Sequence, residues 1–130
     1  MSKQVIRDYV HAFNRGDMDT LRELFTEDAV VQGVLGWGKL DVIMPIWQEI
    51  HDAFAIEMTI DDVIIEGNRG AARYTERGTF RGPFRGNEPT GKSFEVVAME
   101  WFEFRDGKIA KRWGTRDHAS QSRQMGLPLT

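Results

Sequence analysis

The chain has 130 residues, a net charge of −3 and no cysteine. This length is sufficient for one domain, which we expect to span residues 1–130 around a single hydrophobic core. Hydrophobic residues make up 41% of the chain and charged residues 28%, a composition typical of a globular protein that folds without disulfides. Because phosphate binding needs a basic surface, the acidic balance excludes nucleic acid as an expected partner.

Several other classes of site are also excluded by the sequence. The three histidines are scattered at positions 11, 51 and 118 without the spacing of metal ligands, so we expect no metal. No GxGxxG loop for a nucleotide occurs. No apolar run approaches the length of a membrane span, and the N-terminus lacks the apolar core of a signal peptide. We therefore expect a cytoplasmic protein that does not contact membranes.

The first half of the chain is expected to be mainly helical. An apolar stripe over residues 5–13 predicts an amphipathic helix, and Asp17 is placed to cap a second, shorter one. Residues 29–38, AVVQGVLGWG, predict a short strand interrupted by glycines. Asp41 is expected to cap a third helix that ends at about Phe54.

From residue 56 the pattern changes to four long strands. Two hairpin turns are predicted, at Gly67–Gly70 and Asp106–Gly107, because these residues tolerate the positive φ of tight turns. A loop rich in Gly and Pro, from Arg81 to Lys92, separates the two hairpins. Helices followed by strands predict an α+β fold in which helices gather on one side of a curved antiparallel sheet.

The strand SFEVVAMEWFEF, residues 93–104, is apolar on both faces, as expected for a strand that is covered on both sides. One face would meet the helices. We expect the other to be buried in a homodimer, with Met99 and Trp101 as candidate interface residues.

Alternation along the last strand predicts an apolar face formed by Ile109, Trp113, Thr115 and Asp117. The basic residues Lys108, Arg112 and Arg116 lie on the opposite face, which we expect to be solvated. Asp117 has two interpretations. It either caps a short C-terminal helix that begins with DHASQS, or it faces an apolar cavity whose walls raise its pKa into the range of a useful general base.

Glu100 and Arg73 are further candidate catalytic residues. A simple two-residue turn would place Glu100 opposite Trp113 on the face of Asp117, and two carboxylates in one cavity push their pKa values apart. A bulged turn would place Glu103 there instead. Either glutamate could instead face solvent. Arg73, in the middle of its strand, could position an oxyanion or lie on the exposed face.

Aromatic residues give a candidate substrate pocket. Trp37, Trp47, Trp113 and Phe54 would serve either in the core or in a pocket for a flat polycyclic ligand. We therefore expect the partner to be a small apolar or aromatic molecule.

Several motifs resemble those of the SnoaL-like polyketide cyclases, also called ester cyclases, of the nuclear-transport-factor-two-like superfamily. They are RYTERGTF at 73–80, EPTGK at 88–92, DGKI at 106–109, Trp113, Asp117 and RQMG at 123–126. The segment 13–30 is similar to the helix-helix-strand opening of that family. The resemblance implies a cone-shaped α+β barrel, with a curved antiparallel sheet wrapped around three N-terminal helices and an apolar pocket between them.

The resemblance also implies a small enzyme that needs no metal or organic cofactor. It would close a ring by intramolecular aldol condensation, with Asp117 transferring protons on an apolar carbonyl substrate. Phe80 and Gln32 stand at or near positions where many relatives carry histidine, and we assign both to the substrate pocket. The same fold also hosts isomerases, non-catalytic binding domains and epoxide hydrolases. An epoxide hydrolase would need Asp and Arg interleaved around a water, and Arg73 and Asp117 would supply two such groups.

Overall fold

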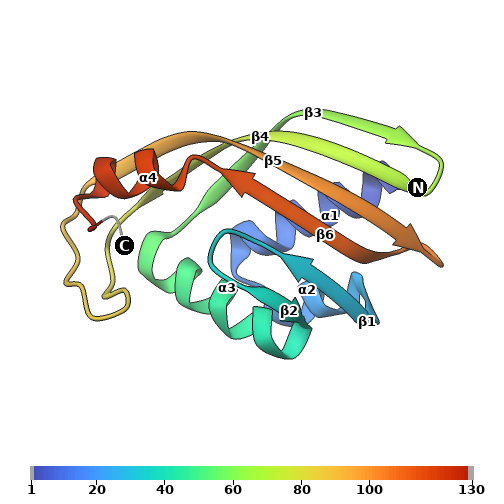
Figure 1. Cartoon of the computed structure of the whole chain (residues 1–130), viewed down its shortest axis with the longest axis horizontal. Helices are drawn as coiled ribbons and strands as arrows, with labels where there is room; N and C mark the ends of the chain where they lie inside the picture. The colour runs from blue at the N-terminus through green and yellow to red at the C-terminus, as the bar shows by residue number, and fades with distance from the viewer. Residues whose placement is uncertain (1, 129–130) are drawn as a thin grey trace.

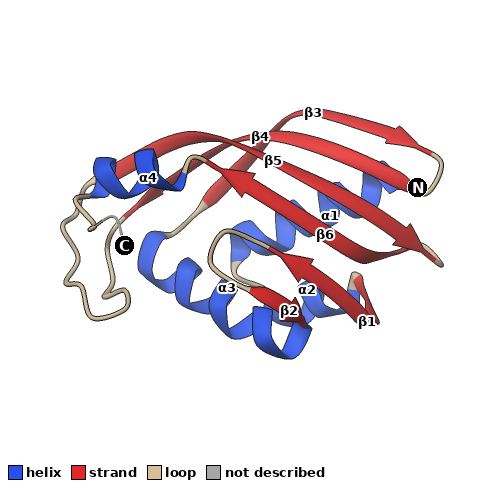
Figure 2. Ribbon diagram, viewed as in Figure 1, coloured by secondary structure: helices blue, strands red, loops and turns tan. Residues whose placement is uncertain are grey.

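The computed structural model describes residues 2–128. The elements follow in the order α1 (Ser2–Arg15), α2 (Met18–Glu23), β1 (Phe25–Gln32), β2 (Trp37–Lys39), α3 (Leu40–Phe54), β3 (Glu57–Glu66), β4 (Arg69–Thr79), β5 (Ser93–Arg105), β6 (Lys108–Arg116) and α4 (His118–Met125). Helices lie along one side of a curved sheet, and α4 lies at one end of it (Figures 1 and 2).

The strands form one sheet in the order β2-β1-β6-β5-β4-β3. The predicted α+β class and curved sheet are confirmed. The sheet is mixed, however, because β1 pairs with β6 in parallel while the other neighbours are antiparallel. The four long strands β3 to β6 are antiparallel as predicted. The parallel pairing comes from β1, which begins at Phe25, earlier than expected, and supplies a full strand along β6.

The helix ends follow from local sequence at most positions. Gly16 has a φ of 69°, which ends α1, and Asp17 caps α2 by accepting a hydrogen bond from the Thr20 amide at 3.1 Å. The third helix ends at Phe54 as predicted. It begins at Leu40, two residues earlier than a cap at Asp41 would give, so Asp41 lies in its first turn and does not cap it.

A one-residue bulge in β6 determines which side chains of this strand face the helices. Phe104 pairs with Ile109 and Glu103 pairs with Lys111, so Ala110 has no partner in β5. A single extra residue reverses the side-chain alternation beyond it. Ile109 therefore faces inward before the bulge, and Arg112 faces inward after it.

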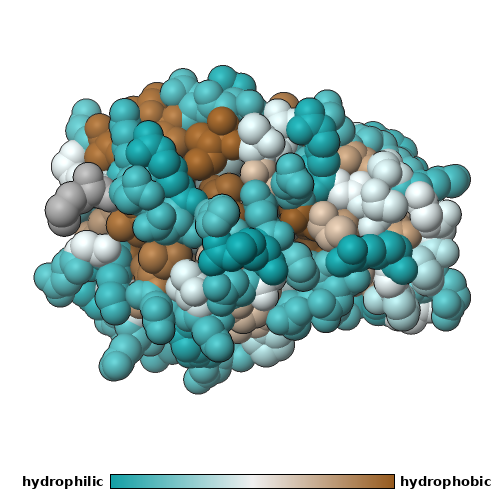
Figure 3. Space-filling model, turned by 180° about the vertical axis from the view of Figure 1, so that it is seen from behind, coloured by the Kyte–Doolittle hydropathy of each residue, from teal (hydrophilic) through white to brown (hydrophobic). Residues whose placement is uncertain are grey.

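The core lies between the inner face of the sheet and the helices. Trp47 of α3 packs against Tyr9, Phe13 and Phe25 with ring centroids about 6 Å apart. Seen from behind, the surface is mostly hydrophilic, with hydrophobic side chains gathered in the upper left of the view (Figure 3). Among residues 2–128, none of the helices is long and apolar enough to cross a membrane.

Candidate active site

A cavity of about 70 Å³ lies between the inner face of the sheet, α1, the end of α3, and α4. Apolar side chains such as Phe13, Phe54 and Met58 form part of its wall. The polar part of the wall is formed by Glu76, Glu100, Arg112, Arg116, His118 and Gln121. Ligand pockets usually hold several hundred Å³, so a bicyclic or larger ligand would have to widen this cavity.

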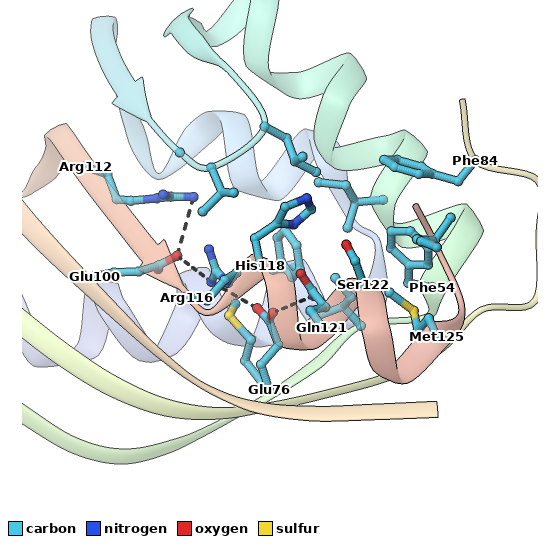
Figure 4. Close-up of a pocket in the computed structure, with 18 of the residues that line it drawn as sticks. Phe54, Glu76, Phe84, Glu100, Arg112, Arg116, His118, Gln121, Ser122 and Met125 are labelled. Carbon is cyan, nitrogen blue, oxygen red and sulfur yellow. Dashed lines mark hydrogen bonds and ion pairs between the residues drawn. The ribbon is translucent and has the colours of Figure 1, made fainter. Parts of the chain in front are cut away.

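The polar residues form one connected network of charges (Figure 4). Arg116 lies between the two carboxylates, with its Nη2 atom 3.0 Å from Glu76 Oε1 and 3.3 Å from Glu100 Oε2. Arg112 Nη2 lies 3.4 Å from the same Glu100 oxygen. The side-chain Nε2 atom of Gln121 donates to Glu76 Oε2 at 3.3 Å.

Two tyrosine hydroxyls complete the surroundings of Glu100. Tyr9 of α1 and Tyr74 of β4 both donate to Glu100 Oε1, at 2.9 and 3.1 Å. Burial is the main cause that raises the pKa of both tyrosines, so they remain protonated donors. Glu100 is thus held by two cations and two hydroxyls.

The two buried carboxylates have pKa shifts of opposite direction. Burial is the largest influence on Glu100 and would raise its pKa, but Arg112, Arg116 and the tyrosine hydroxyls outweigh burial, so the pKa is lowered. Burial also dominates at Glu76, where the cations do not outweigh it, and the pKa of Glu76 is raised. Glu100 therefore stays ionised, whereas Glu76 is the carboxyl that can bind and release a proton.

The predicted placement of Asp117 in the cavity is wrong. Its side chain is exposed, and its Oδ1 atom accepts a hydrogen bond from the Ser120 amide at 2.9 Å, so it is the N-cap of α4. The bulge at Ala110 is the physical reason, because it turns the face shared by Asp117 away from the helices. The alternative interpretation, a helix cap, is confirmed.

The same reversal explains the placement of the other last-strand residues. Arg112 and Arg116, expected in solvent, point inward and line the cavity. Trp113 lies instead on the outer face, where it lines a shallow hollow with Trp101. Arg73, another candidate, is exposed on that outer face and pairs with Asp61 at 3.8 Å.

Glu100 does line the cavity, but for a different reason from the one predicted. The bulge lies in β6 and not in the turn, so Glu100 pairs with Gly114 and its own side chain remains on the inner face. The alternative in which a bulged turn brings Glu103 inward is not realised, because the turn is regular and Glu103 lies on the outer face of β5. The expected pair of carboxylates exists, with Glu76 in place of Asp117.

Of the predicted pocket aromatics, Phe54 lines the cavity. Phe80 is buried behind it, with the two ring centroids 5.4 Å apart. Trp47 is buried in the core, and its ring lies 5.4 Å from the Arg112 guanidinium. Trp37, on the short edge strand β2, is 70% exposed. Gln32 contributes its backbone carbonyl, which accepts from Arg112 Nη1 at 3.3 Å.

Sequence reasoning missed Glu76, His118 and the two inward-facing arginines. A signal for Glu76 was present, since it shares its strand face with Ala72 and Tyr74, and an apolar residue at alternate positions indicates a buried face. The arginines could not be placed without the bulge. Within residues 2–128 no group of three or more His, Cys, Asp or Glu side chains is arranged to hold a metal ion.

Comparison with known proteins identifies the family. A model of the SnoaL-like polyketide cyclase family matches residues 3–125, and a comparison with curated proteins gave no match. Wild-type IdmH from Streptomyces antibioticus, described as a putative polyketide cyclase, is 30% identical with a TM-score of 0.86. That alignment covers 98% of this chain and 99% of IdmH.

Two further solved structures share the fold at lower identity. A protein from Xanthomonas campestris, also described as a putative polyketide cyclase, is 22% identical with a TM-score of 0.87 and coverage of 95% and 96%. AclR from Streptomyces galilaeus, described as a putative hydroxylase, is 22% identical with a TM-score of 0.86 and coverage of 99% and 87%. With its family model matched over residues 3–125, this chain belongs to the SnoaL-like polyketide cyclase family.

Proposed function

We propose that this protein is an acid/base enzyme that moves a proton next to a carbonyl group of an apolar substrate, in an intramolecular aldol-type ring closure. The observation that carries this proposal is the pair of carboxylates in one cavity with opposite pKa shifts. Such a pair separates the group that transfers protons from the group that stays charged. In this site Glu76 is the transferring group and Glu100 the fixed anion.

The cations around Glu76 fit the charge changes of this reaction. The ionised Glu76 would take a proton from the carbon beside the carbonyl and leave an enolate. Arg116, 3.0 Å from Glu76, would then lose the negative charge of that partner and attract the enolate oxygen. A cation that is already in place when charge develops is an effective stabiliser, since it needs no reorganisation.

Hydrogen–deuterium exchange of 2-tetralone, a bicyclic ketone, tests the proton transfer without knowledge of the natural substrate. Loss of the signal of the protons between the carbonyl and the ring is followed by NMR in D₂O. We expect the wild type to accelerate exchange over buffer and Glu76→Gln to lower the rate by about 100-fold or more, the usual contribution of a general base. Glu95→Gln, a change at an exposed strand residue, is the matched control. Equal exchange by wild type and Glu76→Gln would contradict the proposal.

The carboxylate–arginine–carboxylate arrangement also favours a second candidate function, epoxide hydrolysis. Arg116 stands between Glu76 and Glu100, and a water held there could lose a proton to Glu76 and open an epoxide to a diol. Hydrolysis of styrene oxide, measured by chromatography, distinguishes the two candidates. Diol formation that depends on Glu76, without 2-tetralone exchange, would favour the hydrolase.

We also propose that the protein forms a homodimer through the outer face of the sheet. Three large apolar residues of β5, Val97, Met99 and Trp101, are 56%, 52% and 43% exposed on this face, and burying them removes apolar surface from water. Trp101→Ser should lower the mass measured by sedimentation at micromolar concentration from dimer to monomer. Val42→Ser, at an exposed apolar residue of α3, should not. A monomeric wild type would contradict this proposal.

A further inference from the structure

His118 is the first residue of α4, and the start of this helix is rigidly defined. Asp117 accepts a hydrogen bond from the Ser120 amide with its side chain and from the Gln121 amide with its carbonyl, at 2.9 and 3.0 Å. These two contacts determine the direction in which the next side chain leaves the helix. The imidazole of His118 projects into the space between Arg116, Ser122 and the opposite wall (Figure 4).

The ring lies between two neighbouring spaces. It lines the cavity of about 70 Å³ and also a hollow of about 130 Å³. Leu35, Phe84, Ser122 and Leu127 likewise line both spaces. His118 can therefore contact a molecule in either space.

Its Nδ1 atom is buried without a hydrogen-bond partner among residues 2–128. A buried polar atom normally has a partner, so one without any points to a missing ligand or water. The Nε atoms of Arg112 and Arg116 are also buried without a hydrogen-bond partner among these residues, but each of the other titratable side chains has at least one contact: Tyr9 with Glu100, Arg112 with Glu100, and Arg116 with both carboxylates. Of the titratable cavity residues in the described chain, His118 is the one whose side chain has no such contact.

The charges that face this part of the cavity come from three neighbouring strands. Glu76 lies on β4, Glu100 on β5, and Arg112 and Arg116 on β6. On the side of the open hollow, the loop between β4 and β5 contributes Arg85. An imidazole nitrogen can both donate and accept a proton, so His118 has the chemistry needed for proton transfer beside these groups.

We propose that His118 is the second proton-transfer residue of this site and acts as the acid where Glu76 acts as the base. This inference rests on the proposed function. After Glu76 has taken the proton from carbon, the enolate carbon forms a new bond to the acceptor carbonyl carbon, whose oxygen becomes an alkoxide. The Nδ1–H group of His118 donates a proton to that oxygen. Transfer of one proton from Glu76 to His118, directly or through a cavity water, returns both groups to their starting protonation states. The cycle therefore takes up no proton from solvent.

The 2-tetralone exchange assay tests this role, because an acid at the carbonyl oxygen also assists formation of the enol. We expect His118→Gln, which keeps a polar side chain but cannot transfer a proton, to lower kcat at least about tenfold with less than a twofold change in KM. The variation of kcat between pH 5 and 8 should also flatten. His11→Gln, at an exposed residue of α1, is the matched control and should behave as the wild type. Exchange by His118→Gln within twofold of the wild type, with the same pH profile, would overturn the proposal.

The exchange rates of the two variants together separate this inference from the proposed function. Loss of exchange in Glu76→Gln but not in His118→Gln would remove the role of His118 alone. Full exchange in Glu76→Gln would remove the proposed function itself.

Discussion

Replacement of Gly114 by alanine should disrupt the charged network of the cavity. Gly114 lies opposite Glu100 in the sheet, and the guanidinium of Arg112 passes over it. A Cβ atom at this position would lie 2.1 Å from Arg112 Nη1 and 3.1 Å from Glu100 Oε2. Ordinary contacts begin at 3.4 Å, so the guanidinium would have to move by about 1.3 Å in a close-packed interior.

A movement of this size would break both polar contacts of Arg112. These are the ion pair with Glu100 at 3.4 Å and the hydrogen bond to the Gln32 carbonyl at 3.3 Å. Breaking a buried ion pair costs about 3 to 5 kcal/mol. Because Glu100 would keep Arg116 as a partner, we expect the lower end, a loss of about 3 kcal/mol in the free energy of unfolding.

Urea unfolding measures this loss, and a double-mutant cycle with Arg112→Leu separates the displaced arginine from other effects. If displacement of the guanidinium is the cause, Gly114→Ala should cost much less in the Arg112→Leu background than in the wild type. An equal cost in both backgrounds, or a loss below about 1 kcal/mol in the wild type, would refute the reasoning.

Three further predictions concern Glu76, Asp117 and Tyr9. In the wild type, stability should fall as the pH rises from 4.5, the ordinary pKa of a glutamate, through the raised pKa of Glu76, because the unfolded chain releases this proton first. Glu76→Gln should lack this fall. Urea unfolding between pH 4 and 8 measures it, and a wild-type stability that rises over this range would contradict a raised pKa of Glu76. Asp117→Ala should lower the free energy of unfolding by about 1 kcal/mol and Asp117→Asn by much less, since asparagine also caps helices; equal losses in denaturant unfolding would argue against the cap. Tyr9→Phe should cost about 1 kcal/mol or somewhat more, because Glu100 loses one of the two hydroxyls on its Oε1 atom, and an unchanged unfolding midpoint would indicate that Tyr74 alone satisfies that oxygen.

Most of the fold was predictable because its signals are local. The stripe of α1, the turn at Asp106–Gly107 and the cap at Asp117 each depend on a few neighbouring residues, and the structure contains all three. The parallel pairing of β1 with β6 depends on residues about 80 positions apart. No local pattern reports such a contact, so the mixed sheet could not be foreseen.

The sequence predicted the type of the candidate site but only one of its two carboxylates. Two carboxylates in one cavity were expected, and Glu100 is one of them. The second was assigned to the wrong strand, because alternation was counted through Ala110 as if β6 were regular. A basic residue at alternate positions normally indicates a solvated face, and here burial of Arg112 is tolerated only because Glu100 neutralises it. That compensation becomes visible only once the strands are paired.

The bulge at Ala110 has a consequence for the evolution of this chain. Deleting that one residue would restore regular alternation, sending Arg112 and Arg116 out to water and turning Trp113 and Thr115 toward the helices. The chamber would lose both of its cations in a single step and keep Glu76 and Glu100 without them, although no residue of its wall was substituted. In comparisons among relatives, a gap or insertion near this position therefore predicts a change of chemistry more directly than the identities of the residues that follow it.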